Sequence, residues 1–375
     1  MTKLLVVFVA SLVLAYISEQ NTKAIQASGE RYSVWKDWAY LLLLAVLILF
    51  AGLRTQYNDT WNYLHIYKSA PTLTAFVEES ENLNIFKNPL FYAFQSLLKT
   101  CGFDGQMLVF LSSVITQICF VGFIKRYSKD FAFSIFLYFT LGTYVLTLAA
   151  LKQVLGMSLA MLAFPYLEKK EYGKYYFFVF LAMLTHTYAL VFAVLPLFRV
   201  RPWTIFTFAF VSVVLALLLN FEEAITAFME QANDLGKTLT EEEVFHSATI
   251  NVFRLAVYAV PPMISFVFQR RVFADSGPRD HALVHMAIIS FAFMCMGTQA
   301  GANMFGRMGN YLEMGIICTL PWMLRQVFNE RSHKLISAIA CICFMGFFFY
   351  ANMINIQFDA HYKAMTLWKF LQTIF

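Results

Sequence analysis

The sequence predicts an all-α polytopic integral membrane protein, and three observations support this fold class. The chain of 375 residues is 59% hydrophobic and only 14% charged. A soluble protein of this size has too much surface to keep so many apolar side chains away from water. Its apolar runs are long and lack the alternation of a barrel strand, and lipid satisfies no backbone group, so helices are expected. The composition excludes a cytoplasmic enzyme, a nucleic-acid-binding protein and a disordered protein.

The apolar runs predict about 10–12 transmembrane helices, because a span needs about 20 apolar residues and several runs extend into polar flanks. Residues 4–17 have some features of a signal peptide, but no clean cleavage site follows, so we expect a retained first span. Residues 89–100 are predicted to form a half-span or a surface helix. The predicted spans are 4–17, 38–53, 107–124, 131–149, 152–167, 203–220, 250–268, 282–300, 304–324 and 335–357.

Two long polar segments separate the predicted spans, at 54–88 and 221–249. The second is acidic, and Thr240 and Glu243 within it have the spacing of a capping box. No repeat of fixed period and no low-complexity linker divides the chain. We therefore predict a single transmembrane domain over 1–375, with both polar segments as outer loops.

Lysine and arginine set the orientation, because cytoplasmic loops carry an excess of them. With residues 18–37 inside, most of the cations fall in inner loops only if 174–198 enters and leaves on the same side. Twenty-five residues are too few for two crossings, so this segment is predicted to be a re-entrant hairpin of two half-helices meeting near His186. A single crossing is the alternative, and it would place the arginine-rich loop 269–281 outside.

Four cations fall at the outer ends of predicted spans, where the positive-inside rule does not place them. They are Arg54, Lys152, Arg254 and Arg307. Each could reach singly to lipid phosphate. Cations near a membrane are costly without a partner, however, and four at one depth predict an anion site. The planar fork of arginine suits a phosphate.

Three features with polar chemistry complete the candidate site. Asp59 could cap a helix over 60–69, or act as a general base or sugar ligand. His186 could be a buried, hydrogen-bonded histidine or a catalytic group at the tip of the hairpin. Arg307 and Tyr311 are four residues apart and so share a helix face. The sequence shows no phosphate-binding glycine loop, metal-ligand cluster or serine-nucleophile elbow.

Four short motifs resemble the EpsG family of bacterial polysaccharide polymerases, which are Wzy-like proteins of exopolysaccharide and surface-antigen synthesis. One is an arginine–aspartate-threonine–tyrosine stretch after an early span, and another is a basic residue followed by glutamine at the start of a span. The third is a hairpin with basic residues and a central histidine, and the fourth is an Arg-x-x-x-Tyr pair. They are carried by Arg54, Asp59, Thr60 and Tyr63; Lys152 and Gln153; Lys169, Lys170, Tyr172 and His186; and Arg307 and Tyr311.

The resemblance implies a GT-C-class glycosyltransferase in the bacterial cytoplasmic (inner) membrane. Such an enzyme transfers a growing glycan from undecaprenyl pyrophosphate to the next lipid-linked repeat unit at the outer face, in exopolysaccharide or O-antigen synthesis. Charge pattern and resemblance together give His186 and Asp59 as catalytic candidates. The candidate substrate-binding residues are Arg54, Tyr63, Lys152, Gln153, Arg254, Arg307 and Tyr311.

The implied partners are the undecaprenyl-pyrophosphate-linked oligosaccharide and the lipid bilayer, with a chain-length regulator and a flippase as candidate protein partners. No nucleic acid is expected. No cofactor or metal is expected either, since arginines would stabilise the charge on the leaving pyrophosphate.

Two other functions fit a cationic membrane site. A flippase for lipid-linked oligosaccharide would place the cations in a central cavity and often shows two similar halves. A glycan ligase is not separable from a polymerase by sequence. For the base, arginines repel the charged form of a nearby histidine and weaken a nearby carboxylate as a proton acceptor, which favours His186 over Asp59.

Overall fold

The computed structural model describes residues 2–79, 83–234, 249–299, 302–355 and 357–373. The helices and strands of the first half are α1 (Thr2–Ala27), η1 (Val34–Lys36), α2 (Trp38–Gly52), β1 (Arg54–Gln56), α3 (Thr60–Lys68), α4 (Leu73–Glu78), η3 (Ile85–Lys87), α5 (Pro89–Thr100), α6 (Gly105–Tyr127), α7 (Phe131–Thr140), α8 (Thr143–Ala149), α9 (Leu151–Glu168) and α10 (Tyr172–Thr185). Those of the second half are η4 (Thr187–Arg199), α11 (Ile205–Leu219), α12 (Phe221–Asp234), α14 (Val252–Val267), α15 (Gln269–Val272), α16 (Pro278–Met296), α17 (Ala302–Val327), α18 (Glu330–Phe349), η5 (Tyr350–Asn355), α19 (Phe358–His361), β2 (Lys363–Ala364) and α20 (Leu367–Gln372).

Helices cover every predicted span, which confirms an all-α membrane protein. Three stretches of the described chain are long and apolar enough to cross a membrane on their own, namely Lys3–Ala27, Gly105–Tyr127 and Glu330–Ile354. Within the same described residues, four other apolar helices are shorter, at 10–17 residues. Because these fall below the usual length of a span, the total of about 10–12 crossings stays a prediction.

The predicted span 131–149 is not one straight helix. It is broken into α7 and α8, which are bent by 52° relative to each other. Gly142 lies at the break with a φ of +90°, a left-handed conformation that glycine adopts without steric cost. If the pair forms one span, the structure has four full-length candidates.

The residues group into two compact units, whose boundaries fall inside α9, α10 and α18 and between His186 and Thr187. Unit 1 comprises Met1–Leu162, Leu184–His186 and Ile342–Phe375, and unit 2 comprises Ala163–Met183 and Thr187–Cys341. Each unit joins distant parts of the chain, so the division does not coincide with a single linker, and the single transmembrane domain stays a prediction.

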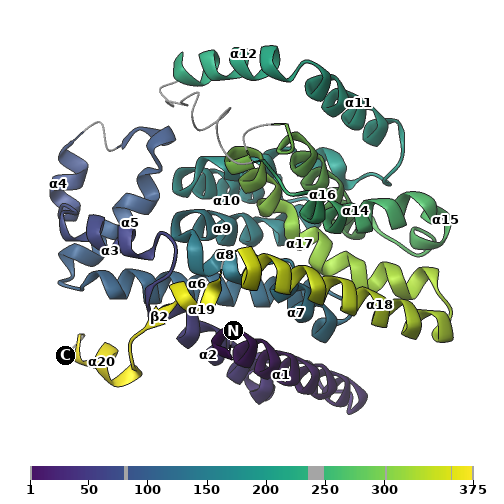
Figure 1. Ribbon diagram of the computed structural model, residues 1–375, viewed down its shortest axis with the longest axis horizontal. Coiled ribbons are helices and arrows are strands. Elements are labelled where there is room, and N and C mark those ends of the chain that lie inside the picture. The colour runs from purple at the N-terminus through teal and green to yellow at the C-terminus, as the bar shows by residue number, and fades with distance from the viewer. Residues whose placement is uncertain (1, 80–82, 235–248, 300–301, 356, 374–375) are drawn as a thin grey trace. The chain divides into compact units, whose positions relative to one another are not determined.

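Unit 1 is built on the packing of α1 against α2 and α7, and of α2 against α6 (Figure 1). The Phe8 ring of α1 lies 5.0 Å from Phe139 of α7 and 5.3 Å from Phe348 of α18, measured between ring centroids. After α2, strand β1 pairs with β2 in an antiparallel arrangement, with Arg54 opposite Ala364. This pairing brings the C-terminal segment to the end of α2.

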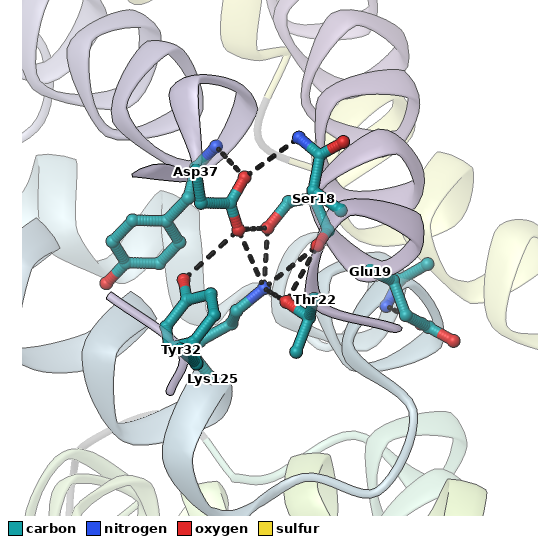
Figure 2. Close-up of polar contacts among 9 residues, drawn as sticks. Ser18, Glu19, Thr22, Tyr32, Asp37 and Lys125 are labelled. Atoms are coloured by element: carbon teal, nitrogen blue, oxygen red, sulfur yellow. Dashed lines mark hydrogen bonds and ion pairs between the residues drawn. The ribbon is translucent and has the colours of Figure 1, made fainter. Parts of the chain in front are cut away.

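A buried polar cluster joins three segments of unit 1, as Figure 2 shows. Asp37, just before α2, accepts hydrogen bonds from Ser18 Oγ at 2.7 Å and Tyr32 Oη at 3.1 Å, and forms an ion pair with Lys125 of α6 at 3.2 Å. Lys125 Nζ also donates to Ser18 Oγ at 2.6 Å and to Thr22 Oγ1 at 2.9 Å. Such dense pairing offsets the cost of burying both charges, and it connects α1 to α2 and α6.

Unit 2 centres on the close packing of α16 against α17 (Figure 1). A Cβ atom added at Gly315 would lie only 2.5 Å from Leu283 O, so the two helices can approach this closely only because position 315 lacks a side chain. Ser290 Oγ of α16 donates to Gly309 O of α17 at 2.8 Å.

The predicted outer loop 221–249 begins with a helix, α12 (Phe221–Asp234). Residues 235–248 of this loop, including the capping box expected at Thr240 and Glu243, lie outside the described residues. The placement of the two loops on the outer face stays a prediction.

Candidate active site

Arg54 is a fully buried cation held by polar groups that carry no charge. Its side chain is 0% exposed. Nε donates to Thr60 Oγ1 at 3.1 Å, and Nη1 donates to Ser113 Oγ at 3.2 Å and to Ala51 O. Within the described residues, Nη2 has no hydrogen-bond partner and no carboxylate pairs with the guanidinium. Burial lowers the pKa of Arg54 to about 10, so the group remains charged at neutral pH.

Thr60 begins helix α3 and is also completely buried. Asp59 precedes it and is exposed, in the N-cap position. Its carboxylate makes no capping hydrogen bond, so the helix forms where it was predicted but without the expected side-chain cap. Arg54 thus holds the buried first residue of α3, and the neighbouring carboxylate is left facing outward.

Four tyrosines lie close enough to Arg54 to influence its pKa, and one of them comes from the far end of the chain. Tyr57, Tyr63, Tyr144 and Tyr362 all interact electrostatically with Arg54. Tyr362 Oη donates to Phe50 O at 2.6 Å, and Met365 N donates to Leu53 O at 2.9 Å. The C-terminal segment therefore completes the environment of Arg54.

Lys152 and Tyr63 lie in one aromatic group of unit 1. Lys152 Nζ is 5.5 Å from the centroid of the Tyr92 ring, a cation–π contact. Tyr92 meets Phe91 edge to face, and Phe91 meets Tyr63 in the same way at 5.8 Å. Gln153, next to Lys152, is buried at 3% exposure.

In unit 2, Arg254 lies on α14 four residues before Tyr258. The two side chains interact electrostatically, and Tyr258 Oη donates to Glu313 Oε1 of α17. Glu313 is almost completely buried, so this hydrogen bond satisfies part of its need for donors. Glu313 lies within the predicted span 304–324, and this buried acid has a tyrosine among its partners.

Arg307 and Tyr311 differ in exposure although they lie four residues apart on α17. Arg307 is exposed, whereas Tyr311 is completely buried and meets Phe192 of η4 edge to face at 6.5 Å. Arg307 is consequently accessible to a ligand, and Tyr311 lies inside the packing of α17 against η4.

His186 lies between two helices that run back along each other. Helix α10 ends at Thr185 and η4 begins at Thr187. Tyr176 Oη donates to Ala193 O at 3.3 Å, and Arg199 Nη1 donates to Tyr172 Oη at 3.2 Å. His186 itself is 7% exposed. The structure contains the helix break where the sequence predicted it. That this hairpin is re-entrant in the membrane stays a prediction.

The structure joins only some of the predicted residues, each group within one unit. Unit 1 joins Arg54 to Thr60 and Tyr63, and unit 2 joins Arg254 to the Tyr258–Glu313 pair. A single cavity bordered by all four cations stays a prediction. Across the ranges that the structure describes, no three His, Cys, Asp or Glu side chains are grouped to hold a metal ion.

Sequence reasoning missed several residues around Arg54. Ser113 and Tyr144 looked like ordinary span residues, and Tyr362 is more than 300 positions away. No spacing rule connects them, because their proximity depends on the packing of α2 against α6 and on the β1–β2 pairing. The hydroxyls of Ser112 and Ser113, adjacent within an apolar run, were a signal that could have been used.

The chain matches a known family over nearly its whole length. The pattern of the EpsG family covers residues 37–364, from the N-cap of α2 to the end of β2. No curated protein and no solved structure matches the chain. The matched range includes every candidate residue described above.

Proposed function

This chain belongs to the EpsG family of Wzy-like polysaccharide polymerases, and we propose that it extends a glycan carried on undecaprenyl pyrophosphate. In this reaction the growing glycan leaves its carrier and is joined to the next lipid-linked repeat unit, at the outer face of the bacterial cytoplasmic membrane. The bundle would be GT-C-like, with the α10–η4 hairpin re-entrant.

The observation that carries the proposal is the buried, positively charged Arg54 within the family's arginine–aspartate-threonine–tyrosine stretch. Hydroxyl and carbonyl groups hold the guanidinium without neutralising it. In a low-dielectric setting such a charge creates a strong positive potential. A leaving pyrophosphate accumulates negative charge as its bond to the sugar breaks, and a preorganised positive potential stabilises it.

Arg54 is too deeply buried to be the main contact of the diphosphate. We assign it the task of setting the local potential and of positioning Thr60. Direct contacts would come from cations that a ligand can reach, namely exposed Arg307 and the partly exposed Lys152 and Arg254. The guanidinium groups suit bidentate binding of phosphate oxygens.

The bond changes are simple. An acceptor hydroxyl attacks the anomeric carbon of the donor sugar, the bond from that carbon to the pyrophosphate oxygen breaks, and a base takes the hydroxyl proton.

The base must approach the acceptor within about 2.6–3.2 Å. Asp59 is exposed at the start of α3, whereas His186 is buried. Accessibility therefore favours Asp59, against the electrostatic argument for His186, and we propose Asp59 as the base.

The glycan ladder of a deletion strain tests the proposal. A polymerase predicts that long glycan disappears while a single repeat unit is still displayed. Repeat units that accumulate inside the cell would instead identify a flippase. Long polymer that forms but is not transferred to its final acceptor would identify a ligase. Either of these two results would overturn the proposed function.

A further inference from the structure

Trp61 is a large aromatic side chain in an unusual setting. It is 64% exposed, although α3 has only nine residues and lies in the predicted outer loop. Its indole stacks on the imidazole of His65, one helical turn later, with ring centroids 5.1 Å apart and planes 9° apart. The stacking holds the indole plane in place on one face of α3, and we call this stacked pair the Trp61–His65 platform.

This platform is part of the wall of a hollow of about 600 Å³. The other walls come from the end of α5 and the start of α6, which provide Lys99 and Asp104, while Lys68 continues the α3 face. Lys99 Nζ is fixed by Lys68 O at 3.2 Å and by the Tyr67 ring at 5.4 Å. Asp104 Oδ1 accepts from the Gln106 and Met107 amides, which holds its carboxylate in place at the start of α6.

The lining combines two kinds of surface that a sugar ring requires. One face of a pyranose carries C–H groups and packs on a flat aromatic surface, whereas its hydroxyls require fixed donors and acceptors at the edge. The Trp61–His65 platform supplies the first surface, and Lys68, Lys99 and Asp104 supply the second. The volume is that of a pocket for several sugar residues rather than for a single ion.

The hollow also lies next to the candidate active site along the chain. Thr55, which follows Arg54, is in its wall, and Trp61 comes two residues after Asp59. We infer that this hollow is a glycan-binding groove, which holds sugar residues of the repeat unit while their reacting end lies at Asp59. The inference rests on the proposed function, and it adds the groove and its residues to it.

A direct binding experiment tests the groove without polymerisation. The probe is an oligosaccharide released by mild acid from the surface polysaccharide of the organism that makes this protein, free of lipid and pyrophosphate. Binding to the purified full-length protein in nanodiscs is followed by saturation-transfer NMR and calorimetry. Trp61→Ala should weaken binding about tenfold or more, because the stacking surface is lost, and Trp61→Phe should recover part of it.

Two control variants make the result specific. Trp35 is 84% exposed in the predicted inner loop, so Trp35→Ala should bind as wild type does. Gln95 lines a different hollow, bordered by Ile66 of α3 and by Ser69 just after it, and Gln95→Ala should also leave binding unchanged. A thermal unfolding midpoint within a few degrees of wild type shows that each variant is folded.

Three outcomes would overturn the groove. The first is no binding by wild type, the second is equal binding by wild type and folded Trp61→Ala, and the third is a loss with Gln95→Ala alone. An exposed tryptophan that only anchors the protein at the membrane surface would give the second outcome. If wild type binds the oligosaccharide through Trp61 but does not polymerise lipid-linked units, the groove stands and the proposed function fails.

Discussion

Arg54 Nε and Thr60 Oγ1 lie 3.1 Å apart, and both side chains are completely buried. This hydrogen bond connects β1 at the end of α2 to the first turn of α3. It also fixes the backbone turn that contains Asp59, whose carboxylate is exposed. A buried charge here therefore has two effects, a positive local potential and a fixed turn that carries the candidate base.

Replacing Thr60 should separate these effects. Thr60→Val removes the acceptor of Arg54 Nε, and a buried unsatisfied donor costs about 1–3 kcal/mol. Thr60→Ser keeps the hydroxyl. We expect short glycan ladders for Thr60→Val and near-normal ladders for Thr60→Ser, at matched protein levels in a complemented deletion strain. Normal ladders with Thr60→Val would show that the hydrogen bond is dispensable.

The base is tested by conservative changes at both candidates. Asp59→Asn should reduce polymerisation of purified lipid-linked repeat units by about 10²–10⁴-fold, the usual contribution of a general base, and donor binding should persist. His186→Gln should retain more activity, since His186 is buried at 7% exposure. An inactive His186→Gln together with an active Asp59→Asn would assign the base to His186.

The cations of unit 2 should be required for long glycan. Arg254→Ala and Arg307→Ala are expected to abolish polymer without lowering the protein level. Lysine at either position should also lose most activity, because a point charge does not reproduce the bidentate fork of arginine. Exposed Arg270, in a predicted inner loop, is the matched control, and Arg270→Ala should polymerise normally. Full activity of both alanine variants would remove these arginines from the site.

The Asp37–Lys125 pair should govern stability in acid. Burial acts to raise the pKa of Asp37, but hydrogen bonds from Ser18 and Asn21 and the charge of Lys125 outweigh it and hold the pKa below its ordinary value of 3.8. The folded state therefore favours the ionised form, and this contribution is present above about pH 4 and lost as pH falls through the lowered pKa.

Two variants check this expectation by unfolding in detergent. Lys125→Met leaves a buried carboxylate without its cation and should cost about 3–5 kcal/mol at neutral pH. Asp37→Asn should be less stable than wild type at pH 7, with a difference that shrinks toward pH 3. A difference that stays constant with pH would contradict a lowered pKa at Asp37.

The orientation of the chain is tested with single cysteines in a background that lacks the six native ones. A membrane-impermeant maleimide should label Glu230→Cys in intact cells but should label Asp275→Cys only after permeabilisation. Both positions are exposed in the structure. Thr74→Cys, in the first predicted outer loop, is the positive control. If 174–198 crosses the membrane once, the two results are exchanged and the re-entrant hairpin is wrong.

The sequence by itself determined the all-α membrane fold class, the positions of the apolar helices and the family. Hydrophobic runs identify membrane helices because lipid forces the backbone to satisfy its own hydrogen bonds, so the expected 107–124 became α6 and 304–324 fell within α17. The helix break at His186 was also predictable, since charge bias in the flanking loops required the chain to turn back. These are local properties, which the chain encodes over short distances.

Only the tertiary structure decided which polar groups lie together and how deeply they are buried. Arg54 was expected at the membrane surface, yet it is enclosed by Ser113 of α6 and by Tyr362 from the C-terminal segment. The four-residue spacing of Trp61 and His65 predicts that they share a face of α3. It does not predict that residues of α5 and α6 lie opposite that face and complete the hollow. Burial and contact between distant residues depend on how helices pack, and packing depends on side-chain shape across the whole unit rather than on the spacing of residues in one segment.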